Sequence, residues 1–423
     1  LKVLSRCNKY NLFMDNMDRV ILHCDMNGFF ASVELLDHPE LKNVPMAVCG
    51  SPDNRHGIIL AKNELAKKAG VVTAETLWQA KRKCPHLKCV PPHHDKYKKY
   101  SKLINDIYYR FTDMVEPFSI DESWLDVTAS QRLFGSGKEI ADKIRETVKS
   151  ELGLTLSAGV SFNKIFAKMG SEYRKPDATT IITRENYKKL LWPLPVGELF
   201  SVGASTAEKL RSLGIKTIGD LAASDILWLE KQLGKYGRMI YEYANGLENS
   251  PVALASERQK IKSVGNGITF RRNLTGADDV RTALTALADT VSSRLRKYQL
   301  KAGGIKVDIK DPNLKVISRQ KQLDTRTNTA EEISTAAFDV LSRSWDMKNP
   351  IRLLTVTAIN LFDEDEEEQI SLFGGDENAR AAGEKLAYAM DSIREKFGDK
   401  AILFGGVINN DIGIDMTETK NDE

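Results

Sequence analysis

The chain has 423 residues, of which 42% are hydrophobic and 28% charged, and its formal net charge is +3. This length exceeds what one hydrophobic core supports, and the composition is that of an ordinary globular protein, so we expect two to four domains. No run of 18 apolar residues exists, and residues 1–9 contain no apolar signal core. These features exclude a membrane protein and predict a cytoplasmic one.

The five Cys residues stand at positions 7, 24, 49, 84 and 89. Their odd number and scattered positions predict reduced thiols rather than a disulfide framework. Residues 84–94 also hold three His residues, but the spacing matches no usual zinc site and Pro91 and Pro92 keep the segment extended. We therefore do not assign a structural zinc ion to it.

Charge is distributed unevenly along the chain. Residues 251–362 contain 19 Lys and Arg against 11 Asp and Glu, a net charge of +8, whereas residues 363–423 contain 6 against 17, a net charge of −11. A basic module followed by an acidic tail predicts a domain that binds a polyanion and a segment that stays off it.

The first buried strand is predicted at Arg19 to Cys24, and it leads into Asp25. A helix is expected directly afterwards, because apolar residues recur at helical spacing from Phe29. An Asp where a central strand meets a helix is the position at which open α/β sheets place metal and phosphate chemistry.

A second acidic element lies between Glu116 and Thr128. Its period-2 pattern predicts two short strands joined by a tight turn that presents Asp121 and Glu122. Two adjacent carboxylates repel each other unless a cation intervenes, so the turn is a candidate half of a divalent-metal site. An ordinary acidic hairpin tip is the alternative, and Asp25 is the third carboxylate that favours the metal site.

These two segments carry a family resemblance. Asp25-Met-Asn-Gly-Phe-Phe-Ala-Ser-Val-Glu34 and Ser119-Ile-Asp-Glu-Ser123 resemble the two catalytic motifs of the Y-family, DNA polymerase IV-like (DinB/UmuC) translesion polymerases of bacteria. The resemblance extends from about Asp18 to about Phe373. It implies an α+β multidomain protein shaped as a right-hand polymerase, with a palm of mixed sheet and helices, small fingers, a helix-hairpin-helix thumb and a βαββαβ little finger.

The expected domain boundaries follow from the resemblance together with the changes in sequence pattern. They are a lead-in at 1–17, the palm at 18–50 and 93–192, the fingers at 51–92, the thumb at 193–250, a tether at 251–260, the little finger at 261–362, and an acidic tail with a C-terminal helix at 363–423.

The resemblance also implies the roles of the site residues. Two Mg²⁺ ions, with Mn²⁺ as an alternative, are expected on Asp25, Asp121, Glu122 and the backbone carbonyl of Met26, with Glu122 serving the ion that activates the primer terminus. Phe30 matches the steric gate beneath the sugar, although without the resemblance it would be predicted as a core residue of an amphipathic helix. The triphosphate is expected to contact Phe29, Phe30, Lys67 and Lys175.

The fingers depart from the family pattern. Ala61, Glu64 and Lys67 stand where most relatives have Thr, Tyr and Arg, and the Tyr and Arg normally grip the triphosphate. Lys67 keeps the charge but loses the bidentate fork, and Glu64 is unfavourable near phosphates unless it pairs with Lys62 or Lys67. We therefore expect a divergent subgroup of the family.

The thumb is predicted from the segment Phe200 to Leu221, which has the pattern of a helix-hairpin-helix with Val202 and Gly203 in the turn and a cap at Ser205. Such a motif directs backbone amides at a phosphate without reading base sequence. A plain αα-hairpin is the alternative.

In the little finger we predict strands at 261–270, 302–310, 314–322 and 351–361 and helices at 278–299 and 329–345. Two βαβ halves would form a four-stranded sheet with both helices on one face. Basic residues on or near the strands would then line the open face and contact the DNA backbone. They are Lys262, Arg271, Arg272, Lys306, Lys310, Lys315, Arg319 and Lys321.

After an acidic run, Gln369-Ile-Ser-Leu-Phe373 resembles the bacterial pentapeptide that binds the sliding clamp, which implies that Gln369, Leu372 and Phe373 contact the clamp. A helix from about Glu377 to Phe397 is expected to end the ordered part of the chain.

The sequence thus predicts a monomeric, error-prone, template-directed DNA polymerase for translesion synthesis. It would bind primer-template DNA and dNTP, transfer dNMP to a primer 3′-hydroxyl with low processivity, and lack a proofreading exonuclease. One alternative is a catalytically silent, clamp-tethered DNA-binding adaptor, which would not need three metal-competent carboxylates. A helix-hairpin-helix nuclease is another.

Overall fold

A computed structural model describes residues 18–50, 57–254, 260–366, 377–408 and 410–414. The chain divides into two compact units, which are described separately. The first contains Leu1–Cys49 and Ile58–Arg258, and the second contains Gly50–Gly57 and Gln259–Glu423. Among the described residues, every helix is too short or too polar to span a lipid bilayer.

The first unit is built around a mixed five-stranded sheet with the order β5-β6-β1-β7-β8. Strand β1 lies at its centre, antiparallel to both β6 and β7, and all six of its residues are buried. The sheet is therefore not the parallel arrangement of an open α/β fold, although a buried central strand carries Asp25 as predicted. The strands are β1 (Ile21–Met26), β5 (Val115–Pro117), β6 (Glu122–Asp126), β7 (Leu156–Ser161) and β8 (Thr179–Ile181).

Alternate residues of β1 face different helices. Leu22, Cys24 and Met26 pack with the apolar faces of α2, α5 and α7. On the opposite face, Ile21 packs with Ala167 of α8, and His23 contacts Ser171 of α8. The helices of this region are α2 (Phe29–Asp37), α5 (His94–Tyr108), α6 (Gln131–Phe134), α7 (Gly137–Leu152), α8 (Lys164–Tyr173) and α9 (Tyr187–Leu191).

Helix α8 approaches the sheet closely because β7 has a glycine beneath it. A Cβ atom added to Gly159 would lie 1.9 Å from the carbonyl oxygen of Ala167, so no other residue fits there without displacing the helix. This approach allows side chains of α8 to reach the strands that carry the acidic residues.

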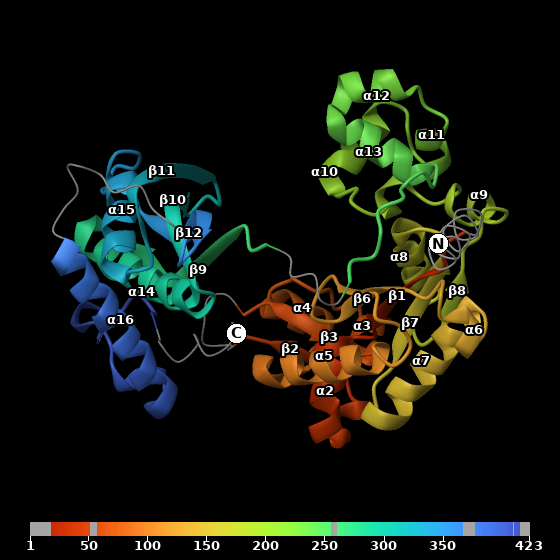
Figure 1. Cartoon of the computed structure of the whole chain (residues 1–423), viewed down its shortest axis with the longest axis horizontal. Coiled ribbons are helices and arrows are strands. Elements are labelled where there is room, and N and C mark those ends of the chain that lie inside the picture. Colours follow the sequence, from red (N-terminus) through yellow and green to blue (C-terminus); the bar gives the residue numbers. More distant parts are fainter. Residues whose placement is uncertain (1–17, 51–56, 255–259, 367–376, 409, 415–423) are drawn as a thin grey trace, which may run out of the picture. The chain divides into compact units, whose positions relative to one another are not determined.

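A small three-stranded sheet with the order β3-β2-β4 and two short helices extends beyond the predicted fingers, because β2 comes from the predicted palm segment 18–50. Figure 1 labels β2, β3, α3 and α4 of this region. The elements are η1 (Pro39–Asn43), β2 (Met46–Cys49), β3 (Ile59–Lys62), α3 (Glu64–Lys68), α4 (Leu77–Lys83) and β4 (Lys88–Val90). Leu60 and Ala61 of β3 pack on a cluster that includes Phe30 and Ala31 of α2, so the fingers adjoin the start of that helix.

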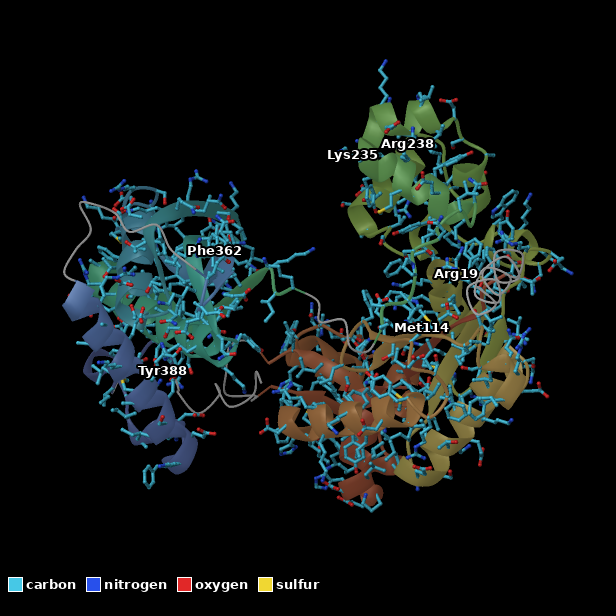
Figure 2. All side chains as sticks on the ribbon, viewed as in Figure 1. Arg19, Met114, Lys235, Arg238, Phe362 and Tyr388 are labelled. Atoms are coloured by element: carbon cyan, nitrogen blue, oxygen red, sulfur yellow. The ribbon has the colours of Figure 1, made fainter. Side chains whose placement is uncertain are left out.

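The thumb consists of the 3₁₀ turn η2 (Val196–Glu198) and the helices α10 (Ala204–Ser212), α11 (Ile218–Ala222), α12 (Ile226–Leu233) and α13 (Lys235–Ala244). Val202 and Gly203 precede α10 as predicted, but the N-cap of the helix is Gly203, and Ser205 lies inside its first turn. The predicted cap at Ser205 is therefore wrong. In Figure 2, Lys235 and Arg238 mark α13, and Arg238 pairs with Glu230 of α12 at 2.9 Å.

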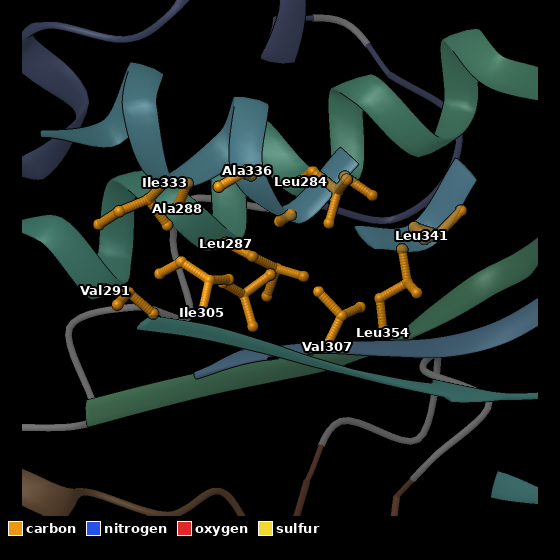
Figure 3. Close-up of a cluster of buried hydrophobic side chains, with 14 of the residues drawn as sticks. Leu284, Leu287, Ala288, Val291, Ile305, Val307, Ile333, Ala336, Leu341 and Leu354 are labelled. Atoms are coloured by element: carbon orange, nitrogen blue, oxygen red, sulfur yellow. The ribbon is translucent and has the colours of Figure 1, made fainter. Parts of the chain in front are cut away.

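The second unit contains the predicted βαββαβ fold, with strands β9 (Ser263–Leu274), β10 (Leu300–Lys310), β11 (Val316–Thr327) and β12 (Ile351–Asp363) and helices α14 (Gly276–Lys297) and α15 (Ala330–Ser342). The strands form an antiparallel sheet with the order β11-β10-β12-β9. Figure 3 shows side chains of α14 and α15, among them Leu287 and Ile333, meeting Ile305 and Val307 of β10 on one face of the sheet.

The predicted basic face is only partly present. Lys306 and Lys310 alternate with the buried residues of β10 and face away from the helices. Lys321, however, pairs in register with buried Ile305 and contacts Asp339 of α15 at 2.8 Å. Arg272 pairs with Asp279 of α14 at 2.5 Å and with Asp411 at 2.6 Å. The prediction that Lys321 lines the open face was wrong, because strand periodicity gives two faces but not which one the helices cover. Contact of Arg272 with DNA stays a prediction.

Helix α16 (Glu377–Phe397) packs on this domain through charged residues. Arg380, Glu384, Asp391 and Arg394 recur at helical spacing and pair with residues of α14, α15 and β10. The pairs are Arg380 with Glu332 at 2.8 Å, Glu384 with Lys301 at 2.8 Å, Asp391 with Arg296 at 2.6 Å, and Arg394 with Asp289 at 2.8 Å. Leu386 and Phe397 of the same helix are exposed.

One further contact joins α16 to the residue after β12, and another joins the strands β11 and β12. Tyr388 donates a hydrogen bond to Glu364 at 2.6 Å, and the guanidinium group of Arg326 lies 3.6 Å from the ring centroid of Phe362. Figure 2 marks Phe362 within the little finger and Tyr388 on α16.

The residues after α16 return to the core of the little finger. Val407, Ile412 and Ile414 are buried in the same hydrophobic cluster as the sheet, and the Arg271 amide of β9 donates to the Ile412 carbonyl at 2.9 Å. The expectation that the ordered part ends at Phe397 is therefore wrong. The few apolar residues of this segment do not follow the period of a helix or a strand, so nothing in the sequence indicates that they are buried.

Candidate active site

The acidic residues come together because β1 and β6 are neighbours. In the antiparallel register Asp25 lies directly opposite Glu122. The Met26 amide donates to the Asp121 carbonyl at 3.1 Å, which ties the end of β1 to the turn that precedes β6. The predicted strand-turn-strand is present, with Asp121 in the turn and Glu122 as the first residue of β6.

Three lysines from α8 and the residues after it face these acidic groups. Lys164 lies 2.7 Å from Glu116, and Lys168 contacts Glu122. Lys175 lies 2.8 Å from Asp25 and 2.7 Å from Glu172. Asp25, Glu116 and Glu122 therefore each have an ammonium partner, and an ammonium is a strongly hydrated point charge that a divalent cation can displace.

The protonation of the carboxylates differs with their surroundings. Burial raises the pKa of Asp25 to about 7, although the charge of Lys175 opposes this shift. Burial also raises the pKa of Asp121. For Glu122, burial acts in the same direction but is outweighed by hydrogen bonds with His23 and Lys168, so its pKa is lowered to about 2. The site thus holds one firmly ionised carboxylate, Glu122, beside two whose charged forms are disfavoured by burial.

His23 is a residue that sequence reasoning missed. It is fully buried, with Nδ1 2.8 Å from Ser171 Oγ and Nε2 3.2 Å from Glu122 Oε2. Burial lowers its pKa to about 4, which keeps the ring neutral. Its position two residues before Asp25 on β1 places it on the same face, and that period-2 relation was the available signal.

Lys168 was missed as well. Lys164, Lys168, Ser171 and Lys175 follow one another at intervals of four, three and four residues, which is the spacing of one helical face. This pattern was visible in the sequence, but which strand that face would cover was not.

The residues present fit a divalent cation. Among the described residues, His23, Asp25 and Glu122 offer ligand atoms that all lie within 4.8 Å of one another. Asp121 is outside this group, and its carboxylate accepts a hydrogen bond from Ser119 Oγ at 2.7 Å. Buried carboxylates with raised pKa values are oxygen donors that a hard cation stabilises.

Phe29 and Phe30 begin α2 beside these carboxylates. Phe29 is buried in the core, whereas Phe30 is partly exposed and stacks on Tyr97 with ring centroids 4.0 Å apart and an interplanar angle of 13°. Tyr97 donates a hydrogen bond to buried Glu34 at 2.5 Å, so the ring beneath Phe30 is itself fixed. The side chain of Phe30 is therefore held in one orientation.

The fingers residues are arranged as the sequence suggested. Glu64 pairs with Lys67 at 3.7 Å, and both side chains are exposed. Lys62 donates to Thr73 Oγ1 at 2.9 Å, and burial lowers its pKa. The structure thus shows Glu64 neutralised by Lys67, one of the two pairings under which its presence is tolerable.

The other predicted site residues lie elsewhere. Val202, Gly203 and Ser205 are in the thumb, and Lys262 and Arg271 lie at β9 of the second unit. Gln369, Leu372 and Phe373 fall outside the described residues, between β12 and α16 in the sequence.

Three family models match the chain. One described as the impB/mucB/samB family matches residues 24–172, and one for the C-terminal domain of that family matches residues 261–372. A third, described as the thumb domain of DNA polymerase-iota, matches residues 197–248. A solved Y-family DNA polymerase chimera superposes with a TM-score of 0.73 at 26% identity, covering 81% of this chain and 99% of its own. The fold is therefore that of a Y-family polymerase.

Curated relatives extend the similarity over nearly the whole chain. DNA polymerase IV of Acetivibrio thermocellus is 47% identical over 398 residues, which cover 94% of this chain and 99% of the relative. DNA polymerase IV 1 of Bacillus subtilis is 36% identical over 403 residues, which cover 94% of this chain and 95% of the relative. The chain belongs to the impB/mucB/samB family and is a bacterial, DinB-like member of it.

Proposed function

We propose that the protein is an error-prone, template-directed DNA polymerase that performs translesion synthesis by adding dNMP from dNTP to a primer 3′-hydroxyl. The observation that carries this proposal is the placement of Asp25 opposite Glu122 on adjacent strands, with Asp121 in the preceding turn. The similarity to curated DNA polymerase IV proteins supports it. Low processivity and the absence of proofreading belong to the same proposal.

Mg²⁺ is the proposed ion, at two positions per site, with Mn²⁺ as an alternative. Asp25, Asp121, Glu122 and the Met26 carbonyl would hold the ions, since all four offer oxygen ligands. When bound, the ions would favour the ionised primer hydroxyl and offset the charge of the leaving pyrophosphate. Glu122, already ionised, is the carboxylate on the primer side. His23 and Lys168 orient it through their contacts with Oε2.

Lys67 and Lys175 are proposed to bind the triphosphate. Lys175 lies 2.8 Å from Asp25, so it would be free to contact a phosphate if a cation took its place beside the carboxylate. Phe29 and Phe30 support the sugar end of the nucleotide, and the fixed ring of Phe30 would exclude a 2′-hydroxyl. Phe30→Ala should therefore raise the ratio of ribonucleotide to deoxyribonucleotide incorporation roughly 10- to 100-fold. An unchanged ratio would contradict the role of Phe30.

The catalytic proposal is tested by primer extension with Glu122→Gln. We expect extension to fall roughly 10²- to 10³-fold, because the side chain keeps its shape but loses the charge that binds the cation. Binding to primer-template DNA, measured by fluorescence anisotropy, should stay within a factor of two. Glu40→Gln, the same change on the exposed turn η1, is the matched control and should extend normally.

The two readouts separate the competing functions. If parent protein and variant both bind DNA and neither extends a primer, the adaptor function replaces the polymerase. If the parent cuts labelled duplex instead of extending a primer, the nuclease function replaces the polymerase.

DNA is proposed to contact the thumb at Val202, Gly203 and Ser205 and the little finger at Lys262, Arg271 and Arg272. Arg272 already has two carboxylate partners, so we expect it to contribute least of the three basic residues.

A sliding clamp is proposed as partner of Gln369, Leu372 and Phe373. Leu372→Ala with Phe373→Ala should abolish clamp binding and retain synthesis on a short primer-template, whereas loss of both would argue against a separate docking motif.

A further inference from the structure

The fingers expose a large aromatic side chain that the proposed mechanism does not use. Trp78 of α4 is 66% exposed, although tryptophan is among the side chains that gain most from burial. Three other Trp residues, at 124, 192 and 345, donate their indole N–H to a backbone carbonyl. Trp78 makes no such bond to any residue that the structure describes.

Packing does not require a Trp at this position. Leu77 and Ala80 provide the buried face of α4, and Cys84 continues that face into the fingers core. The helix begins with a capping box between Thr76 and Gln79, which fixes its first turn. Trp78 therefore points to solvent from a well-anchored helix rather than from a frayed end.

Arg82 holds the indole ring in place. It follows Trp78 by four residues, one helical turn, and its guanidinium carbon lies 4.8 Å from the ring centroid. A guanidinium over an aromatic ring is a favourable contact that also leaves the rest of the ring accessible. The pair forms an aromatic platform bordered by positive charge.

The segment that carries the platform is strongly basic. Residues 57–92 contain seven Lys and Arg against two Glu, and each Glu already has a partner: Glu64 pairs with Lys67 and Glu75 with Lys83. Lys68, Lys81 and Lys88 are exposed and form no ion pair with any described residue. Such a surface favours a polyanion, and the aromatic platform favours one whose bases are unpaired.

The platform belongs to the same structural unit as the active site. Glu75 and Ala74, just before α4, exchange backbone hydrogen bonds with Ile59 of β3, at 2.9 and 2.8 Å. Strand β3 ends at Lys62, whose carbonyl lies against Gly28 in the turn after Asp25, 3.2 Å from where a Cβ would stand. A continuous backbone connection thus links the platform to the turn that carries the catalytic site.

We propose that Trp78 and Arg82 form a stacking site for an unpaired nucleotide of single-stranded template DNA. The inference rests on the proposed polymerase function, which supplies a template strand that is single-stranded ahead of the primer end. A base stacks on the indole ring while Lys68, Lys81 and Lys88 contact the backbone phosphates. Because every base has a π face, the site is indifferent to sequence.

The test compares two primer-templates with the same duplex, one with a blunt template end and one with a 5′ overhang of twelve thymidines. We expect the parent to bind the overhang substrate more tightly. Trp78→Ala should weaken binding of that substrate roughly fivefold or more and leave the blunt substrate unchanged. Trp78→Phe should retain most of the affinity, and Arg82→Ala should lose less than Trp78→Ala. Leu133→Ala, which removes a side chain that is 82% exposed on α6, is the matched control and should bind both substrates normally.

A second measurement uses the indole itself. Oligothymidylate should quench the fluorescence of the parent, and the quenching should be absent from Trp78→Phe, which folds with an aromatic ring in the same place. The stacking site is overturned if Trp78→Ala keeps the parent's overhang affinity, which would instead favour a protein partner for this surface, or if it weakens both substrates equally. Primer extension by the same proteins separates this inference from the proposed polymerase function. If the Trp78 variants extend primers normally and show no loss of overhang affinity, only the stacking site is overturned. If the parent neither binds DNA nor extends a primer, the stacking site and the polymerase function are both overturned.

Discussion

Two sets of ion pairs between a helix and its neighbours, one in the palm and one in the little finger, use different cationic groups. In the palm, Lys168 and Lys175 extend from α8 and the residues after it toward carboxylates on the sheet. In the little finger, three of the four ion pairs that join α16 to its domain use an arginine, namely Arg296, Arg380 and Arg394. A lysine ammonium is compact and easily exchanged for another cation, whereas a guanidinium fork matches one carboxylate geometry with two hydrogen bonds.

The Arg394 and Asp289 pair illustrates the second kind. Two parallel bonds of 2.9 and 2.8 Å join them, and both side chains are nearly buried. The palm site instead concentrates acidic groups whose partners are single ammonium groups. We infer that the palm contacts give way when substrate and metal arrive, and that the α16 contacts fix a structure.

The largest expected effect is on the palm side. Asp25→Asn should reduce primer extension roughly 10³-fold, because the site loses a cation ligand and leaves Lys175 with Glu172 as its only carboxylate partner. Unfolding of the little finger should be unaffected. Extension rate and hydrogen exchange of residues 260–414 measure the two effects, and destabilisation of the little finger would contradict the separation of the two units.

Breaking one α16 contact should affect stability rather than chemistry. Asp289→Asn leaves Arg394 nearly buried without its counter-charge, and we expect a loss of about 3 kcal/mol in the unfolding free energy of the second unit. Extension at low temperature should remain close to normal. Arg343→Ala, which removes an exposed partner of Asp339, is the control and should leave the unfolding free energy nearly unchanged. Equal losses would show that the α16 contacts are ordinary surface pairs.

The smallest effect is a pH dependence that distinguishes the exchangeable site. Because the pKa of Asp25 is raised to about 7, a cation must displace a proton below that pH, and Mg²⁺ affinity should fall about tenfold per pH unit between pH 7 and 5. Isothermal titration calorimetry measures the affinity. An affinity that does not change over this range would show that Asp25 is ionised throughout.

The same shift predicts a stability profile for the metal-free protein. The folded pKa of Asp25 lies above its usual value of 3.8, so its contribution to stability should increase as the pH falls from 7 to about 4. Glu122 acts oppositely, since its pKa is lowered to about 2, and stability from this group should be lost as the pH falls from about 4.5 to 2. Denaturant titrations of the parent and of Glu122→Gln, with and without Mg²⁺, separate the two contributions.

Sequence alone determined the main elements of both units. Alternation at Glu116–Thr128 predicted the strand-turn-strand of β5 and β6, and the buried run at Arg19 predicted β1. The βαββαβ order of the little finger followed from its period-2 and period-3.6 segments. These patterns arise from burial of one face of each element, which a single stretch of sequence records directly.

Only the tertiary structure decided which faces meet. It placed Glu122 opposite Asp25, brought His23 and Lys168 to that carboxylate, and turned Lys321 toward α15 instead of the open face. It also placed Ile412 and Ile414 in the core of the little finger, although the sequence had predicted that this domain ends at residue 362. Long-range pairing depends on register and on the choice between two faces, and local periodicity is the same for either choice.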